Sequence, residues 1–229
     1  MRSVTYLRII GVARRFSWIT WGFGHWLSIN CYWIGPDPGR FNQTPGLQWS
    51  LRYLPNQGPH TSRIESLIDA NLRLPAAFTS AHQVVAEEID EYAHVNNAIY
   101  LQWLDGIAWA HSSKLGLPIE RCLALRRGMA VRHTRVDYLE AALLGDALLI
   151  ATWIVACDSR LRCTRRFEIL RVIDGRRVLE AEIDYFCLNL DTGKPCRFPR
   201  EFVDCYAVMP EVAAAIAGLP NALRGIGHA

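Results

Sequence analysis

The sequence predicts an α+β fold in which a curved antiparallel sheet wraps around one long central helix. Three observations predict it: a strand-like run followed by a long apolar helical stretch, four further strand-like runs after that stretch, and turn residues between the runs. A chain of 229 residues, of which 51% are apolar, suits one domain of ordinary size with an appendage.

The first strand and the central helix are predicted between residues 82 and 115. His82–Ile89 has the character of a strand, and the stretch from Asn97 to about Leu115 has the period of a helix. An apolar stripe recurs along this helix at every fourth residue, with neighbours that widen it: Ile99, Trp103, Ile107 and His111, then Tyr100, Leu104 and Ala108. Gly116 and Pro118 are expected to end the helix. Asp105 is its only formal charge before the last turn, so we expect Asp105 to be nearly buried.

Four strands are predicted after the helix, and turn dipeptides separate them. The strands are expected at Met129–Tyr138, Ala147–Cys157, Leu161–Ile173 and Val178–Leu190. The turns are marked by Gly145-Asp146, Asp158-Ser159 and Asp174-Gly175. This succession predicts an antiparallel meander.

The N-terminal third differs from the rest of the chain. It holds five of the eight Trp, and residues 35–60 are crowded with Pro, Gly, Asn and Gln without a sustained period. We therefore divide the chain into an N-terminal extension at 1–77, poorly ordered or of unknown role, a folded domain at 78–210 and a C-terminal tail at 211–229.

Phe16–Ile34 is a possible membrane segment within this extension. It lacks acidic residues, Lys and Arg, and it follows Arg14-Arg15, a pattern that a signal anchor or an organelle transit peptide would share. Glycines and polar residues interrupt it and no convincing cleavage site follows. We expect a cytoplasmic protein without a membrane role.

Charge and cysteine usage exclude several classes of protein. The net charge of +3 is too small to indicate nucleic-acid binding, and the basic excess lies in residues 1–75, which carry eight Arg and three acidic residues. The seven cysteines form no C-x-x-C pair and no His-rich cluster. This pattern favours structural thiols in a reducing compartment over a disulfide framework or a zinc site.

The segment from Asp90 to Tyr100 carries the strongest indication of chemistry. A carboxylate follows the first strand, and His94 and two Asn precede the apolar helix. The first N–H groups of a helix have no partner within the helix, and they hold a developing negative charge. The order of residues therefore places a carboxylate and a histidine beside such a helix end, and it predicts a catalytic segment.

These residues resemble the hotdog-fold acyl-CoA thioesterases of the 4-hydroxybenzoyl-CoA thioesterase type. The family pattern D-x-x-x-H-V-N-N-x-x-Y stands here from Asp90 to Tyr100, and the run Val136–Asp146 is similar to the family's second strand and the loop into its third. The resemblance covers roughly residues 80–207. The family often has Gly where this chain has Ala93, so we expect a turn that avoids positive φ.

The resemblance implies a role for three residues in catalysis. Asp90 would act as nucleophile or as general base toward water, and both roles stay open. The backbone N–H of Asn97 would point at the thioester oxygen, while His94 would orient Asp90, donate to that oxygen or bond backbone across the turn. The structural alternatives are a turn cap for Asp90 and helix N-capping for Asn96 and Asn97.

The resemblance also implies where an acyl-CoA substrate would bind. The acyl chain would run beside the central helix, where Asn96, Tyr100, Trp103 and Asp105 are candidates for binding it, although aromatic residues at this spacing are more often core. Some of the arginines around the strands would bind CoA phosphates. We expect no cofactor and no metal, and a homodimer or tetramer, because a lone domain exposes its sheet edges.

Two alternatives remain from the sequence, besides a membrane-anchored thioesterase if Phe16–Ile34 inserts. A hotdog enoyl-CoA hydratase also uses Asp and His near the helix, but its D-x-N-P-x-H arrangement is not matched between Asp90 and His94. A non-catalytic acyl-CoA binding protein would keep the fold without needing a carboxylate beside the thioester.

Overall fold

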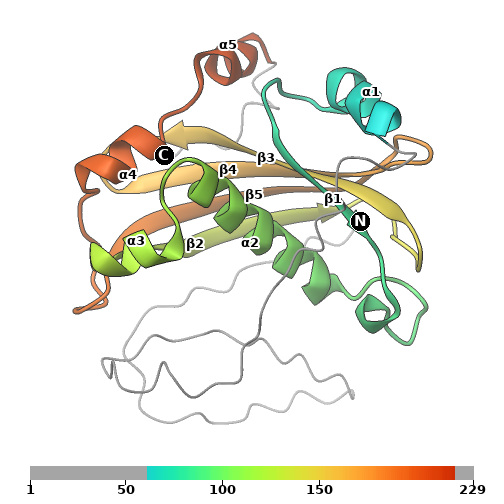
Figure 1. Ribbon diagram of the computed structural model, residues 1–229, viewed down its shortest axis with the longest axis horizontal. Helices are drawn as coiled ribbons and strands as arrows, with labels where there is room; N and C mark the ends of the chain where they lie inside the picture. The colour runs from blue at the N-terminus through green and yellow to red at the C-terminus, as the bar shows by residue number, and fades with distance from the viewer. Residues whose placement is uncertain (1–60, 220–229) are drawn as a thin grey trace. The chain divides into compact units, whose positions relative to one another are not determined.

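The computed structural model describes residues 61–219, which form one five-stranded antiparallel sheet with helices on both faces (Figure 1). The strands are β1 Phe78–Gln83, β2 Arg127–Tyr138, β3 Ala147–Cys157, β4 Arg162–Arg171 and β5 Arg177–Asn189. This architecture confirms the predicted α+β hotdog fold. The predictions for residues 1–60, including Phe16–Ile34, lie outside the described residues.

The strand order is β1-β3-β4-β5-β2, so the predicted meander is right for three strands and wrong for β2. β2 pairs with β5, with Val136 opposite Ala181, and not with β3. The Gly145-Asp146 turn instead leads the chain onto β1, since Val84 exchanges backbone hydrogen bonds with both turn residues. A turn dipeptide marks a reversal of the chain but does not determine which strand pairs next.

The first strand lies earlier than predicted. β1 ends at Gln83, and Ala86–Glu88 forms a single 3₁₀ turn, η2, where the strand was expected to continue. The Glu88 carboxylate accepts the Val85 N–H at 3.0 Å and closes this turn. The apolar pair Val84-Val85 extends the strand-like pattern into a segment that has left the sheet.

The central helix α2 spans Asn97–Lys114, as predicted. The Asn96 side chain accepts the Ala98 N–H at 2.9 Å and caps its first turn. Gly116, at φ 97°, ends it in a Schellman motif, in which the Leu117 N–H reaches the Ser112 carbonyl.

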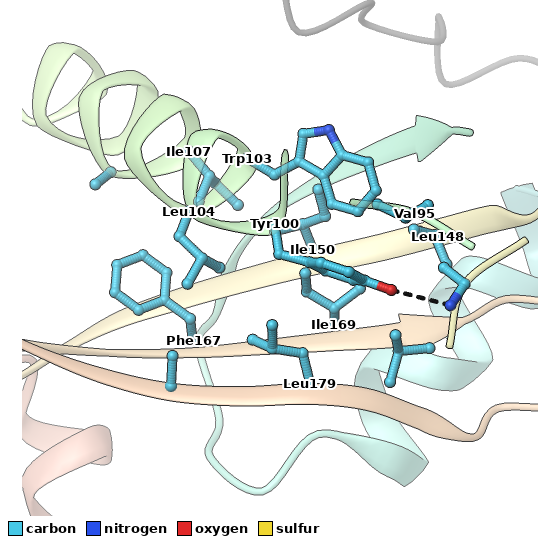
Figure 2. Close-up of a cluster of buried hydrophobic side chains, with 14 of the residues drawn as sticks. Val95, Tyr100, Trp103, Leu104, Ile107, Leu148, Ile150, Phe167, Ile169 and Leu179 are labelled. Carbon is cyan, nitrogen blue, oxygen red and sulfur yellow. Dashed lines mark hydrogen bonds between the residues drawn. The ribbon is translucent and has the colours of Figure 1, made fainter. Parts of the chain in front are cut away.

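The main core lies between α2 and one face of the sheet (Figure 2). Leu104 and Ile107 of α2 are fully buried against the inward residues of three strands: Leu148, Ile150, Phe167, Ile169 and Leu179. These strand residues alternate in sequence, as the two-residue period of a strand requires.

The opposite face of the sheet is covered by α1 Thr61–Asn71 and α5 Pro210–Gly218 (Figure 1). Leu67 of α1 packs with Leu149 and Leu170, and Val212 of α5 packs with Trp153. The described parts of the N-terminal extension and of the C-terminal tail are therefore joined to the sheet by apolar contacts. The boundaries at 77 and 211 stay predictions for the rest of those segments.

Two short helices close one end of the sheet. α3 Ile119–Ala124 and α4 Arg200–Cys205 bury Cys122 and Phe202 beside the strand residues Cys163 and Cys187. The six cysteines of the described residues are free thiols. Within residues 61–219, no helix has the length and apolar character that crossing a membrane requires.

Candidate active site

The turn before α2 is built around the Asp90 carboxylate. Its Oδ1 accepts the backbone N–H of Tyr92 at 2.9 Å and, more weakly, that of His94 at 3.4 Å, while the Asp90 N–H donates to the His94 carbonyl at 2.8 Å. Within the part of the chain that the structure describes, Oδ2 makes no hydrogen bond. Asp90 is therefore a turn cap through one oxygen, and it keeps the other oxygen for a further partner.

Ala93 lies in this turn with φ 60°, so the expectation that the turn avoids positive φ is wrong. The Ala93 N–H donates to the Asp90 carbonyl at 3.0 Å, and the paired bonds of the turn hold the residue there. A non-glycine residue in the left-handed region is strained, and such strain is common at functional sites.

The N-terminus of α2 presents an N–H group to this turn. The Asn96 side chain occupies the Ala98 N–H, and the Asn96 carbonyl accepts the Ile99 N–H at 2.9 Å. No acceptor among residues 61–219 takes the Asn97 N–H. A backbone donor at the positive end of a helix is thus left without an acceptor.

A half-buried carboxylate, that of Glu88, links this turn to the strand and the helix beside it. Glu88 Oε1 accepts the Trp103 indole N–H at 3.0 Å, and Oε2 accepts from His82 Nε2 at 3.0 Å in addition to Val85. The Glu88 carbonyl accepts the Asn96 N–H at 2.9 Å. Glu88 therefore connects β1, η2 and α2 next to the Asp90 turn.

Two tyrosines form the wall beside the helix end. The Tyr100 hydroxyl accepts the Ala142 N–H at 2.9 Å, and the Tyr138 hydroxyl donates to the Asn97 carbonyl at 3.1 Å (Figure 2 shows the Tyr100 bond). The two rings meet edge to face, with centroids 5.5 Å apart. Burial raises the pKa of both hydroxyls, so both are protonated at neutral pH.

These features surround one hollow of about 520 Å³. The predicted residues Asp90, His94, Asn97 and Tyr100 all line it, together with residues that the sequence analysis did not select: Tyr92, Val95, Tyr138, Leu139, Glu140 and Ala141. The second group comes mainly from the loop after β2. The signal that pointed there was the family-like run from Val136 to Asp146, which was used for the fold but not for the site.

The loop after β2 is held in place by Arg171. Its guanidinium forms ion pairs with Glu140 at 3.2 Å and Asp146 at 3.1 Å, and it donates to the Ala141 carbonyl at 2.7 Å. These bonds fix the wall of the hollow that faces Asp90.

Three predicted substrate-binding residues do not line this hollow. The Asn96 side chain is committed to the helix cap, and Trp103 lies in the core, bonded to Glu88. Asp105 is solvent-exposed, so the expectation that it is nearly buried is wrong. It lines a different cavity, farther along α2. Desolvation of its carboxyl group by the surrounding protein raises the pKa of that group.

The histidine of the motif faces the hollow without a fixed partner. Its ring is exposed and makes no hydrogen bond to the described residues, while its backbone N–H and carbonyl bond to Asp90 across the turn. Of its predicted roles, bonding backbone across the turn is met by its main chain. Donation by its ring to a substrate oxygen stays a prediction.

The strand arginines that were candidates for binding CoA phosphates differ in their surroundings. Arg126, Arg135 and Arg166 form ion pairs with Asp191, Asp137 and Glu182, respectively. Arg132 and His133 are exposed on the outer strand β2. That some of these arginines contact CoA phosphates stays a prediction.

The hollow combines a carboxylate oxygen, an open backbone N–H and tyrosine hydroxyls on one rigid frame. A carboxylate activates water or attacks a carbonyl, and a preorganised N–H stabilises the oxyanion that results. The arrangement has the parts that acyl transfer to water requires.

The fold and the hollow define a hotdog domain with an acidic residue at the helix N-terminus. Residues 84–216, more than half of the chain, match the family model of the thioesterase-like superfamily. The chain belongs to that superfamily.

Individual relatives are more distant. Protein THEM6 of zebrafish (Danio rerio) is 32% identical over 78 residues, which are 34% of this chain and only 38% of the length of that protein. Slr0204, a 1,4-dihydroxy-2-naphthoyl-CoA thioesterase from Synechocystis, has a TM-score of 0.52 and 20% identity, covering 57% of this chain and 96% of its own. SAV2348 from Staphylococcus aureus, solved in complex with CoA, has a TM-score of 0.54 and 21% identity, covering 59% and 85%. At these identities the two solved structures establish the shared fold.

Proposed function

We propose that the protein is an acyl-CoA thioesterase, which hydrolyses an acyl-CoA thioester to a free acid and CoA. One observation carries the proposal: the unbonded Asp90 Oδ2 and the open Asn97 N–H belong to residues that line the same hollow. Membership of the thioesterase-like superfamily supports it. The motif from Asp90 to Tyr100 favours the 4-hydroxybenzoyl-CoA thioesterase type within that superfamily.

The proposed chemistry has two routes that share one oxyanion contact. In the general-base route, Asp90 takes a proton from water as the water oxygen attacks the carbonyl carbon. In the nucleophilic route, an Asp90 oxygen attacks, forms a mixed anhydride as CoA leaves, and water then hydrolyses the anhydride. In both routes the carbonyl oxygen becomes negative and accepts from the Asn97 N–H, the C–S bond breaks, and the CoA sulfur takes up a proton.

Asp90→Asn tests the proposal. We expect the rate of thiol release from acyl-CoAs to fall at least about a hundredfold while CoA binding is retained. Glu91→Gln is the matched control, because Glu91 is the next residue, is exposed and does not line the hollow. An unchanged rate in Asp90→Asn would remove the proposed role.

A panel of short, long, aromatic and cationic acyl-CoAs identifies the acyl group. If none is hydrolysed by the wild-type protein while several bind, the chain is a non-catalytic acyl-CoA binding protein.

We also propose that the chain forms a homodimer or a larger homo-oligomer. β2 lies at one edge of the sheet that the described residues form. It exposes large apolar side chains to solvent: Val131 is 52% exposed and Tyr138 is 45% exposed. An unpaired edge with apolar side chains favours association through that edge. The partner would complete the wall of the hollow next to Tyr138.

A further inference from the structure

A second cavity, of about 60 Å³, lies farther along α2 than the Asp90 hollow. Its α2 residues are Asp105, Ala108, Trp109 and Ser112, whereas the hollow uses Asn97 and Tyr100 at the start of the helix. Arg165 of β4, Tyr185 of β5 and Tyr206, the residue after α4, add polar groups to its lining. The cavity is large enough for a carboxylate group and too small for a whole acyl-CoA.

Arg165 occupies a core position of the sheet. It shares the inward face of β4 with Cys163, Phe167 and Ile169, and it is only 3% exposed. A guanidinium in this row of apolar side chains is not explained by the alternation of the strand, and burying it has a high cost in free energy unless it is paired.

The protein gives this guanidinium only neutral partners. Nη1 donates to His111 Nδ1 at 2.8 Å, and Nη2 donates to the Ser112 hydroxyl at 3.0 Å. The Tyr206 ring lies 5.6 Å from the Arg165 Cζ, and its hydroxyl is 3.2 Å from Ser112 Oγ. Burial, and then the Arg165 charge, lower the pKa of His111 to about 4, so His111 is neutral at physiological pH.

Across residues 61–219, no carboxylate forms an ion pair with Arg165. Asp105 is the one acidic residue of the cavity lining, and it too makes no ion pair with the guanidinium. A guanidinium carries more N–H donors than these two bonds use, and its fork matches a carboxylate.

We propose that the Arg165 cavity is a binding site for the carboxylate group of a small organic acid. The carboxylate would accept from the free N–H groups of Arg165. The hydroxyl of either Ser112 or Tyr206 would supply one further donor, because the other hydroxyl proton is used in the bond between them. The apolar part of the acid would lie toward Met129 and Val131 at the start of β2. The acid is either a free carboxylic acid or the far end of a dicarboxylic acyl group.

Binding of hexanoate, with hexanamide as its neutral analogue, tests the site on the full chain. We expect saturating hexanoate to raise the melting temperature by about 2–4 °C and hexanamide to leave it unchanged. Arg165→Met should weaken hexanoate binding at least about tenfold. Arg162→Met is the matched control, because Arg162 is exposed on the same strand.

A second measurement needs no variant. In the wild-type protein with ¹⁵N-labelled side chains, hexanoate should shift the Arg165 Nε–H and His111 ring signals, and hexanamide should not. Equal responses to the two compounds, or equal losses in Arg162→Met and Arg165→Met, would overturn the proposal. No response to hexanoate, together with a lower molecular mass of Arg165→Met in light scattering, would overturn it in favour of a carboxylate from a second copy of the chain.

Hydrolysis kinetics show whether the carboxylate belongs to a free acid or to the far end of an acyl group. Only this measurement rests on the proposed function. If the far end of the acyl group binds, adipyl-CoA should have a KM at least about tenfold below that of hexanoyl-CoA, and Arg165→Met should abolish the difference. If the free acid binds, the two esters should have equal KM values while hexanoate still binds. Failure of all hydrolysis would contradict the thioesterase proposal and leave the hexanoate result intact.

Discussion

Glu88→Ala is the substitution that most directly tests how the Asp90 turn is supported. The Glu88 carboxylate accepts three hydrogen bonds at 3.0 Å each, from Val85 N–H, His82 Nε2 and the Trp103 indole. Alanine removes the acceptor for all three donors and leaves them in place.

The structure sets the size of the effect. A hydrogen bond to a charged group contributes about 1.5–3 kcal/mol, and a buried donor without an acceptor costs about 1–3 kcal/mol. His82 and Trp103 are 6% and 5% exposed, so water does not replace their acceptor, whereas Val85 is half-buried and water partly does. We expect Glu88→Ala to lower the free energy of unfolding by about 3–5 kcal/mol.

Urea unfolding with linear extrapolation measures this loss. Glu87→Ala is the matched control, since Glu87 lies in the same 3₁₀ turn, is exposed and makes no hydrogen bond to the described residues, and it should change stability by less than about 0.5 kcal/mol. A loss below about 1 kcal/mol in Glu88→Ala, or one equal to that of the control, would refute the assignment of Glu88 as the support of the turn.

Two further predictions concern backbone strain and pH. Ala93→Gly should stabilise the protein by about 0.5–1 kcal/mol in the same assay, because Ala93 has φ 60°. Ala98→Gly, within α2, should destabilise the protein by a similar amount. A change of the same sign in both variants would contradict the strain at Ala93. His111 has its pKa lowered from 6.5 to about 4, so the unfolded chain binds its proton first and stability should fall by about 2–3 kcal/mol as pH drops from 6.5 to 4. His111→Gln should flatten this part of the profile and His133→Gln, at an exposed position, should not; equal profiles would contradict the burial of a neutral His111.

Periodicity predicted the elements that bury a regular stripe. α2 repeats an apolar residue every four positions and ends at Gly116, and both its bounds were predicted because packing and capping act locally. The same logic failed at Val84-Val85, where apolar character continued beyond β1. There the Glu88 side chain, and not the pattern, decides that the chain turns.

The pairing of β2 with β5 was not predictable from local pattern. The segments before and after the Gly145-Asp146 turn both have the pattern of strands, so a hairpin of these two strands was the simplest prediction. The observed pairing of β3 with β1 depends on backbone bonds between the turn and Val84, some sixty residues earlier. It also depends on Arg171 of β4, which forms an ion pair with Asp146 of the turn. Contacts of this range leave no periodic trace in a single sequence.

The candidate site divides in the same way. Asp90, His94 and Asn97 were selected because they share one short motif, and Tyr100 because it lies on the next turn of the helix. Tyr138, the last residue of β2, and Glu140, in the loop after it, line the same hollow, although they lie some forty residues later in the sequence. Only the fold brings them there. Arg165 was one of several strand arginines in the sequence, and nothing local distinguishes its buried position from the exposed one of Arg162.

The two interpretations of Asp90, turn cap and catalytic carboxylate, are compatible because they use different oxygens. Oδ1 accepts from Tyr92 and His94, and Oδ2 is left for substrate or water. Asparagine keeps one acceptor oxygen for the turn and replaces the other oxygen by a neutral NH2 group. Asp90→Asn should therefore leave the free energy of unfolding within about 0.5 kcal/mol of the wild type while activity falls. Asp90→Ala should in addition lower stability by about 1 kcal/mol. If Asp90→Asn lost as much stability as Asp90→Ala, its loss of activity would report a damaged turn, and the chemical role of the carboxylate would need other evidence.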